Sequence, residues 1–130
     1  MLFRSIDTIK QKYAGTKVGA TESIFVYLAE ATNLDLITPR SYLNAISEGN
    51  DPSAADKSVM LNQIERKQIK VLLFNPQNST PEIQGLVDRA RANGIAIVQM
   101  TETPVPSDVT FQAWQTAQLR TLLQALSRAA

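Results

Sequence analysis

The sequence contains no cysteine and no histidine. The absence of cysteine excludes disulfide bonds and thiolate metal sites within these 130 residues. The absence of histidine removes the commonest proton-transfer group near neutral pH and the commonest ligand of transition metals. Any acid–base or metal chemistry of this chain must therefore rest on its carboxylates.

The chain also lacks a charge of one sign and a long hydrophobic run. It has 13 basic and 12 acidic residues and a net charge of +1, so no basic footprint for nucleic acid stands out. No stretch approaches the roughly 20 apolar residues that a membrane-spanning helix needs. The first residues show no signal peptide, because no basic region is followed by a continuous apolar segment. We therefore expect no nucleic-acid partner and no membrane insertion.

Motifs of the common enzyme classes are missing as well. The sequence contains no GxGxxG, no Walker lysine motif and no GxSxG, and it has no histidine for a catalytic triad. Hydride, phosphoryl and acyl transfer therefore lack their usual parts. We expect that the chain is not an enzyme.

The hydrophobic pattern alternates between helical and strand periodicity along the whole chain. It predicts strands near 17–21, 34–37, 69–74 and 95–98, and helices near 2–13, 22–32, 52–67, 80–93 and from 111 onward. Such alternation favours parallel strands joined by right-handed crossovers. The fold class is therefore α/β, with a three-layer open sheet of about four mainly parallel strands and helices on both faces. The 44% hydrophobic content suffices for one core, so residues 1–130 are expected to form a single domain.

Local signals refine these boundaries. The nearly continuous apolar run 69–74 predicts a central strand covered on both faces. The breakers between Thr38 and Pro52 predict a long loop, in which residues 41–46 could form a short helical turn. Asp51 before Pro52 predicts a helix N-cap, and Ser79 three residues before Glu82 has the spacing of a capping box.

Two glutamates follow strands of the predicted sheet. Glu22 comes directly after the first strand and Glu102 after the last, and ligands of open parallel sheets bind at the carboxyl ends of strands. Two carboxylates that converge there would suit a cation. The alternatives are that Glu22 occupies the first turn of its helix, with Thr21 as cap, and that Glu102 is an exposed loop residue.

Other polar and aromatic residues near these positions have simpler explanations. We expect Asn75, Gln77 and Asn78 to satisfy local backbone groups, although they could contact a polar ligand. Glu48 and Asp51 could supplement an oxygen-rich site. Trp114, at helical spacing with Phe111, is expected to belong to the core.

Several segments together resemble a known family. They are VGATESIF at 18–25, YLAEA at 27–31, FNPQ at 74–77, TETP at 101–104 and FQAWQ at 111–115. In this order they resemble the C-terminal lobe of the zinc/manganese-type (cluster A-I) periplasmic solute-binding proteins of ABC importers. The similarity extends from residue 17 to near the end of the chain. On this resemblance, residues 1–15 would be the end of the helix that links the two lobes, and residues 16–130 the C-terminal lobe.

The resemblance implies a function in metal capture. A zinc or manganese ion, the transported ligand, would be held in a cleft between two lobes, with histidines supplied mainly by the first lobe. Glu22 matches the ligand after the first strand of the second lobe, and Glu102 matches an acidic ligand position whose flanking residues here differ from the family's usual ones. Two carboxylates without histidine would form an open oxygen half-site, so we expect weak metal binding by this chain alone.

The resemblance also implies partners and a location. The partners would be the missing N-terminal lobe and an ABC permease, and the parent protein would be periplasmic or membrane-anchored and extracellular. Two other functions remain open at this point. One is a metal-assisted hydrolase that uses the same glutamates, and the other is an interaction module that forms a homodimer through the exposed interlobe face.

Overall fold

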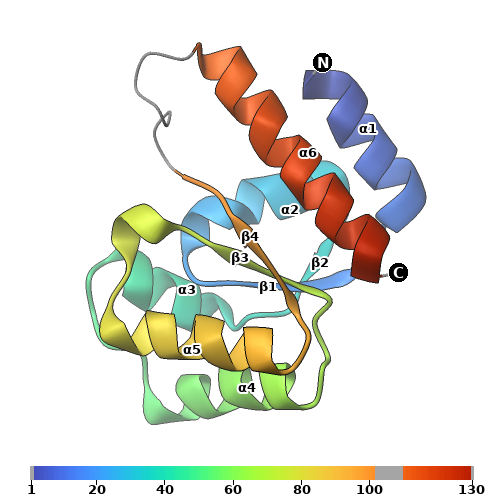
Figure 1. Ribbon diagram of the computed structural model, residues 1–130. Helices are drawn as coiled ribbons and strands as arrows, with labels where there is room; N and C mark the ends of the chain where they lie inside the picture. The colour runs from blue at the N-terminus through green and yellow to red at the C-terminus, as the bar shows by residue number, and fades with distance from the viewer. Residues whose placement is uncertain (1, 102–109, 130) are drawn as a thin grey trace.

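The computed structural model describes residues 2–101 and 110–129. Helices and strands alternate along this part of the chain (Figure 1). The elements, in order, are α1 (Leu2–Tyr13), β1 (Lys17–Ala20), the 3-10 helix η1 (Ser23–Phe25), α2 (Val26–Thr32), β2 (Asp35–Leu36), α3 (Arg40–Ser47), α4 (Ala54–Glu65), β3 (Val71–Phe74), the 3-10 helix η2 (Pro76–Asn78), α5 (Pro81–Ala92), β4 (Ala96–Gln99) and α6 (Phe111–Ala129).

The four strands form one parallel sheet with the order β2-β1-β3-β4. Strands β1 and β3 are therefore central, and Ala20 pairs with Leu73 in their register. All four residues of β3 are buried, as expected for a strand covered on both faces. The predicted α/β class, the parallel sheet and the central place of residues 69–74 are confirmed.

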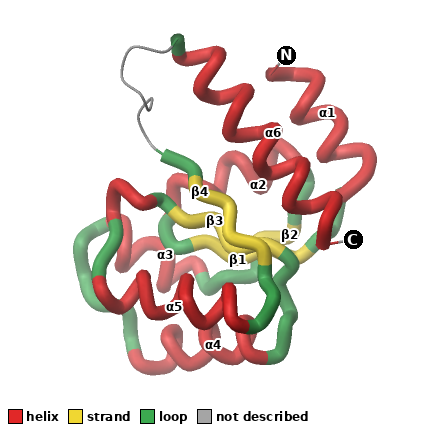
Figure 2. Tube along the Cα trace, in the orientation of Figure 1, coloured by secondary structure: helices red, strands yellow, loops and turns green. Residues whose placement is uncertain are grey.

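Helices cover both faces of the sheet (Figure 2). Helices α1, α2 and α6 lie on one side, where Val18, Leu73 and Leu122 belong to one core cluster. Helices α3, α4 and α5 lie on the other side, where Met60, Leu72 and Val87 belong to a second cluster. The sheet thus separates two hydrophobic layers, which makes the three-layer architecture.

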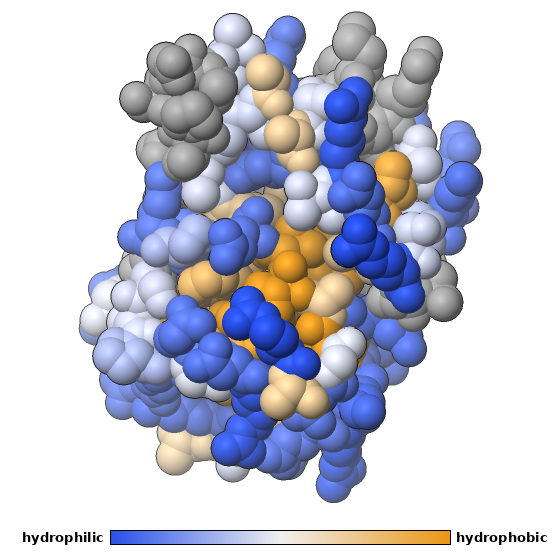
Figure 3. Space-filling model, in the orientation of Figure 1, coloured by the Kyte–Doolittle hydropathy of each residue, from blue (hydrophilic) through white to orange (hydrophobic). Residues whose placement is uncertain are grey.

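Strand β4 forms one edge of the sheet. Its residues Ala96 and Ile97 are only half-buried. Figure 3, in the orientation of Figure 1, shows apolar surface in the middle of the molecule, in the region where Figure 1 draws β4 between α5 and α6.

The expected long loop between Thr38 and Pro52 is wrong, because most of it forms the helix α3. Tyr42 and Leu43 of this helix are fully buried against the sheet, and this burial stabilises the segment. Pro39 precedes the helix, and Gly49 follows it with a φ of 77°. These two breakers therefore mark the ends of a helix and not the interior of a loop.

Two predicted helix caps are also wrong by one or two residues. Ser53, and not Asp51, caps α4, because its side chain accepts a hydrogen bond from the backbone nitrogen of Asp56 at 3.1 Å. Thr80, and not Ser79, caps α5 in the same way. Proline is favoured at the first helical position because it lacks an N–H group, so Pro81 places the cap at the residue before it.

Within the described ranges, no helix is both long and apolar enough to cross a membrane.

Candidate metal centre

The candidate site lies where the sheet changes its winding direction. The chain leaves β1 through α2 toward β2 on one side, and it leaves β3 through α5 toward β4 on the other side. Because β1 and β3 are neighbours, their carboxyl ends flank the point at which the two connections diverge. In open α/β sheets this switch point is the usual ligand site.

Glu22 lies at this point and is buried. The backbone nitrogen of Thr21 donates to the carbonyl oxygen of Leu73 at 3.1 Å, so the pairing of β1 with β3 continues beyond the strand itself. Glu22 then keeps an extended backbone, with φ −158° and ψ 169°, before η1 begins at Ser23. Its side chain is only 3% exposed. Thr21 is therefore not a helix cap, and Glu22 precedes the helical residues instead of forming their first turn.

Asn75 is the residue that meets Glu22 across the switch point. Its Nδ2 donates to Oε1 of Glu22 at 2.7 Å, and its side chain is 1% exposed. Its Oδ1 accepts from the backbone nitrogen of Gln77 at 2.9 Å, which confirms the expected local role of this amide. The contact with Glu22 was not predicted, although both residues directly follow neighbouring central strands.

The turn after Glu22 is tied to a neighbouring helix. The backbone nitrogen of Ser23 donates to Oγ of Ser47 at 2.9 Å, and the two hydroxyl groups lie 2.7 Å apart. Ser47 is the last residue of α3. The segment that carries Glu22 is therefore bound to β3 on one side and to α3 on the other.

Glu102, the second predicted ligand, lies outside the described residues. The described residues after strand β4 end at Thr101, whose Oγ1 accepts a hydrogen bond from Nε1 of Trp114 at 2.8 Å. Trp114 is buried, as predicted for a core residue. Phe111 packs edge-on against it with ring centroids 5.3 Å apart, and Phe111 itself is exposed.

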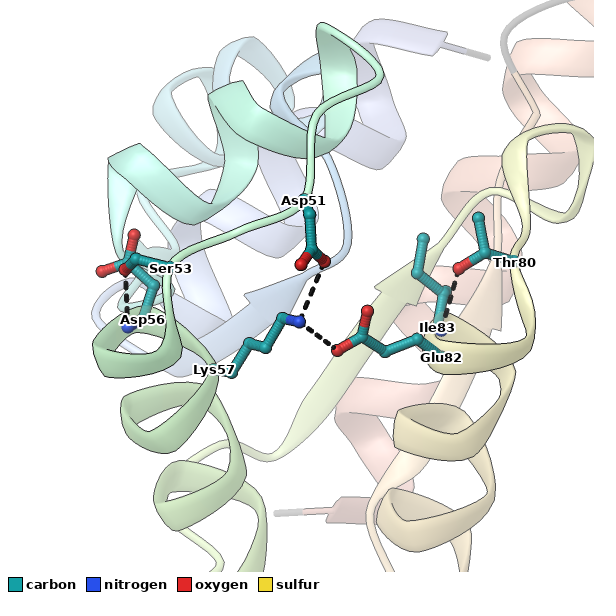
Figure 4. A network of polar contacts seen from close by, with 7 residues as sticks. All are labelled: Asp51, Ser53, Asp56, Lys57, Thr80, Glu82 and Ile83. Carbon is teal, nitrogen blue, oxygen red and sulfur yellow. Dashed lines mark hydrogen bonds and ion pairs between the residues drawn. The ribbon is translucent and has the colours of Figure 1, made fainter.

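The remaining acidic candidates are occupied elsewhere. Asp51 pairs with Lys57, whose Nζ lies 2.9 Å from Oδ1 of Asp51 and 2.9 Å from Oε1 of Glu82 (Figure 4). These hydrogen bonds raise the pKa of Lys57. Glu48 is exposed and accepts a long hydrogen bond from Asn50. Among residues 2–101 and 110–129, no three acidic side chains gather closely enough to hold a metal ion together.

An apolar groove of about 520 Å³ lies beside the switch point. It is lined by residues of η1 and α2, by residues that follow β4 and by the first half of α6, among them Ile24, Phe25, Tyr27, Leu28, Met100 and Trp114. Tyr27 is 80% exposed at the rim. Ile24 and Phe25 follow Glu22 closely in the sequence, so the groove borders the turn after this carboxylate.

A model of a known protein family matches nearly the whole chain. The model of ZnuA, the periplasmic component A of the zinc-uptake complex, matches residues 2–125. The chain belongs to the ZnuA family. The resemblance inferred from the sequence is confirmed, and no curated protein matches the chain in sequence.

Solved structures similar to this ZnuA-family chain have the same fold. The laminin-binding protein Lmb of Streptococcus agalactiae, described as an adhesin with metal-transporting activity, is 19% identical with a TM-score of 0.67, over 96% of this chain and 46% of that one. The solute-binding protein FpvC from Pseudomonas aeruginosa, in complex with Mn2+, is 12% identical with a TM-score of 0.64, over 99% and 47%. A Zn(II)-bound variant of AdcAII from Streptococcus pneumoniae is 15% identical with a TM-score of 0.67, over 96% and 43%. The chain therefore spans about half the length of these proteins.

Proposed function

We propose that this chain is the metal-binding C-terminal lobe of the solute-binding component of an ABC importer. The observation that carries the proposal is the buried carboxylate of Glu22 at the switch point of a ZnuA-family sheet. The similar structures that contain Mn2+, Ni2+ or Zn(II) support a divalent cation as the captured ion. The ion is the transported substrate, so the role is capture without turnover.

Glu22 and Glu102 are the ligands that this lobe would contribute. Carboxylate oxygens bind zinc and manganese, but two of them leave an open site with little preference between the ions. The other ligands would come from an N-terminal lobe across a cleft that closes by a hinge or rigid-body motion. The isolated chain is therefore expected to bind these ions weakly.

The groove beside Glu22 supports a lobe that docks against another surface. Its lining is largely apolar and begins at Ile24, two residues after Glu22, and Tyr27 at its rim is exposed. Helix α1 packs along α6, which supports the assignment of residues 1–15 as the end of a linking helix and of residues 16–130 as the lobe. The partners in this proposal are the N-terminal lobe and an ABC permease, in the periplasm or at the outer face of a membrane.

Calorimetric titration of zinc and manganese into the purified chain tests this function. The unchanged chain is compared with Glu22→Gln, with Glu102→Gln and with a matched control, Glu30→Gln, which alters an exposed glutamate on α2. We expect weak binding that both site variants reduce and the control leaves intact. Binding that is unchanged in Glu22→Gln would overturn the assignment of this residue.

A further inference from the structure

The orientation of the Asn75 side chain follows from simple hydrogen-bond chemistry. The backbone N–H of Gln77 can only donate, so the atom of Asn75 that faces it at 2.9 Å must be the carbonyl oxygen. The amide nitrogen then necessarily faces Oε1 of Glu22, which accepts at 2.7 Å. A carboxylate in place of this amide could accept from Gln77 but could not donate to Glu22 without a proton. Both contacts together therefore require an amide.

Glu22 and Asn75 both follow residues whose backbone is hydrogen-bonded in the sheet. The Thr21 nitrogen is bonded to the Leu73 carbonyl at 3.1 Å, and the Phe74 carbonyl accepts from the Met100 nitrogen at 2.9 Å. The residues before Glu22 and before Asn75 are thus held in the sheet. Both side chains are almost fully buried. Asn75 therefore holds Oε1 of Glu22 from a position that directly follows a hydrogen-bonded strand.

A neutral donor suits a cation site better than a charged one. A lysine or arginine at position 75 would neutralise the charge of the Glu22 carboxylate, which a cation needs. An acidic residue there would repel this carboxylate before the ion binds. An amide supplies a hydrogen bond and leaves the negative charge in place. Such contacts to a metal ligand fix its orientation, and their removal typically lowers metal affinity by about 10- to 100-fold.

We infer that Asn75 is a positioning residue for metal capture, which orients the carboxylate of Glu22 through the Nδ2–Oε1 hydrogen bond. This inference rests on the proposed function, because it takes Glu22 as a metal ligand. Asn75 does not bind the ion in this role. It acts through the ligand that it holds.

Two substitutions at the same position test the inference, because both remove the amide that donates to Glu22. Manganese affinity is measured by electron paramagnetic resonance of the free ion for the unchanged chain, Asn75→Ala and Asn75→Asp. We expect about tenfold weaker binding in Asn75→Ala and weaker binding also in Asn75→Asp, because neither side chain can donate a hydrogen bond to Glu22. Unchanged affinity in Asn75→Ala, or tighter binding in Asn75→Asp, would overturn the inference. Asn93→Ala is the control, because it removes a half-buried amide that donates to the backbone carbonyl of Arg89 in α5.

A measurement on the unchanged chain covers the case in which a variant fails to fold. The side-chain amide of Asn75 gives its own nitrogen–proton signals in an NMR spectrum. With zinc, we expect these signals to shift together with the backbone signal of Glu22, whereas a shift of Glu22 alone would contradict the inference. If zinc leaves Glu22 unperturbed, or if Glu22→Gln keeps full affinity, the proposed function fails, and that result is distinct from a failure at Asn75.

Discussion

The amide nitrogen of Asn75 lies 2.7 Å from the carboxylate of Glu22, although 53 positions separate the two residues in the sequence. The parallel pairing of β1 with β3 brings them together, because each follows its strand at the same edge of the sheet. This hydrogen bond thus links the strand order of the sheet to the proposed metal ligand. It also means that substitutions at Glu22 and at Asn75 should have different effects on stability and on metal binding.

Glu22→Gln is expected to leave the metal-free chain nearly as stable as before. The glutamine carbonyl can still accept from Asn75, so the free energy of unfolding should change by less than about 1 kcal/mol. Asn75→Ala should cost about 1–3 kcal/mol, because it leaves a buried carboxylate without this donor and removes the bond to Gln77. Urea denaturation of both variants measures the difference. A Glu22→Gln variant as unstable as Asn75→Ala would contradict the expectation that glutamine still accepts the hydrogen bond from Asn75.

Gly19→Ala should destabilise the central strand β1. A Cβ atom at this position would lie 2.9 Å from Cδ1 of Ile69 and 3.3 Å from Oγ1 of Thr38, which itself accepts from the backbone nitrogen of Ala20. Overpacking of this kind costs about 1–3 kcal/mol, and adding Ile69→Val should recover part of it by removing the closest atom. Thermal unfolding measures the change. In the control Gly85→Ala, nothing lies within 4 Å of the added atom, and helix propensity predicts a gain of up to about 1 kcal/mol.

The stability of the chain should fall at alkaline pH because of Tyr42. Burial, together with the charge of Glu82, raises the pKa of this phenol to about 12 from 10.0 in the unfolded chain. Between these values the folded state holds a proton that the unfolded state has lost, so stability is retained below pH 10.0 and lost as the pH approaches about 12. Urea midpoints measured from pH 9 to pH 12 for the unchanged chain and Tyr42→Phe test this. An equally steep decline in the variant would assign the effect to other groups.

The bridge through Lys57 should contribute little to stability in spite of its two ion pairs. Its side chain is 34% exposed, and Asp51 is 74% exposed, so water screens both contacts. We expect Lys57→Met to cost little stability, with the loss disappearing at high salt. Denaturation at low and high ionic strength measures it. A large loss that persists at high salt would mean that the bridge fixes the loop before α4 in another way.

The sequence pattern predicts the layers of this fold well and its local details less well. The apolar run 69–74 indicates a central strand because covering both faces demands apolar residues at every position, and β3 is buried throughout. The α3 segment was missed because Pro39 and Gly49 were interpreted as loop residues, while the burial of Tyr42 and Leu43 depends on tertiary packing. Periodicity alone cannot show such packing.

The candidate site, like the fold, can be predicted only in part from the sequence. The position of Glu22 after a strand is visible in the sequence, because strand ends carry the ligand sites of such sheets. Its contact with Asn75 is not, because the strand order that makes β1 and β3 neighbours is set by the whole sheet. Asp51 was expected to cap α4, and instead it binds Lys57, while Ser53 provides the cap.

The most direct test of the account is the position of a bound ion. Crystals of the chain soaked in manganese and measured for anomalous scattering would locate the ion independently of any affinity. We expect an anomalous peak within direct coordination distance of a carboxylate oxygen of Glu22, because carboxylates are suitable ligands for manganese. A peak confined to other carboxylates, with none at Glu22, would contradict it.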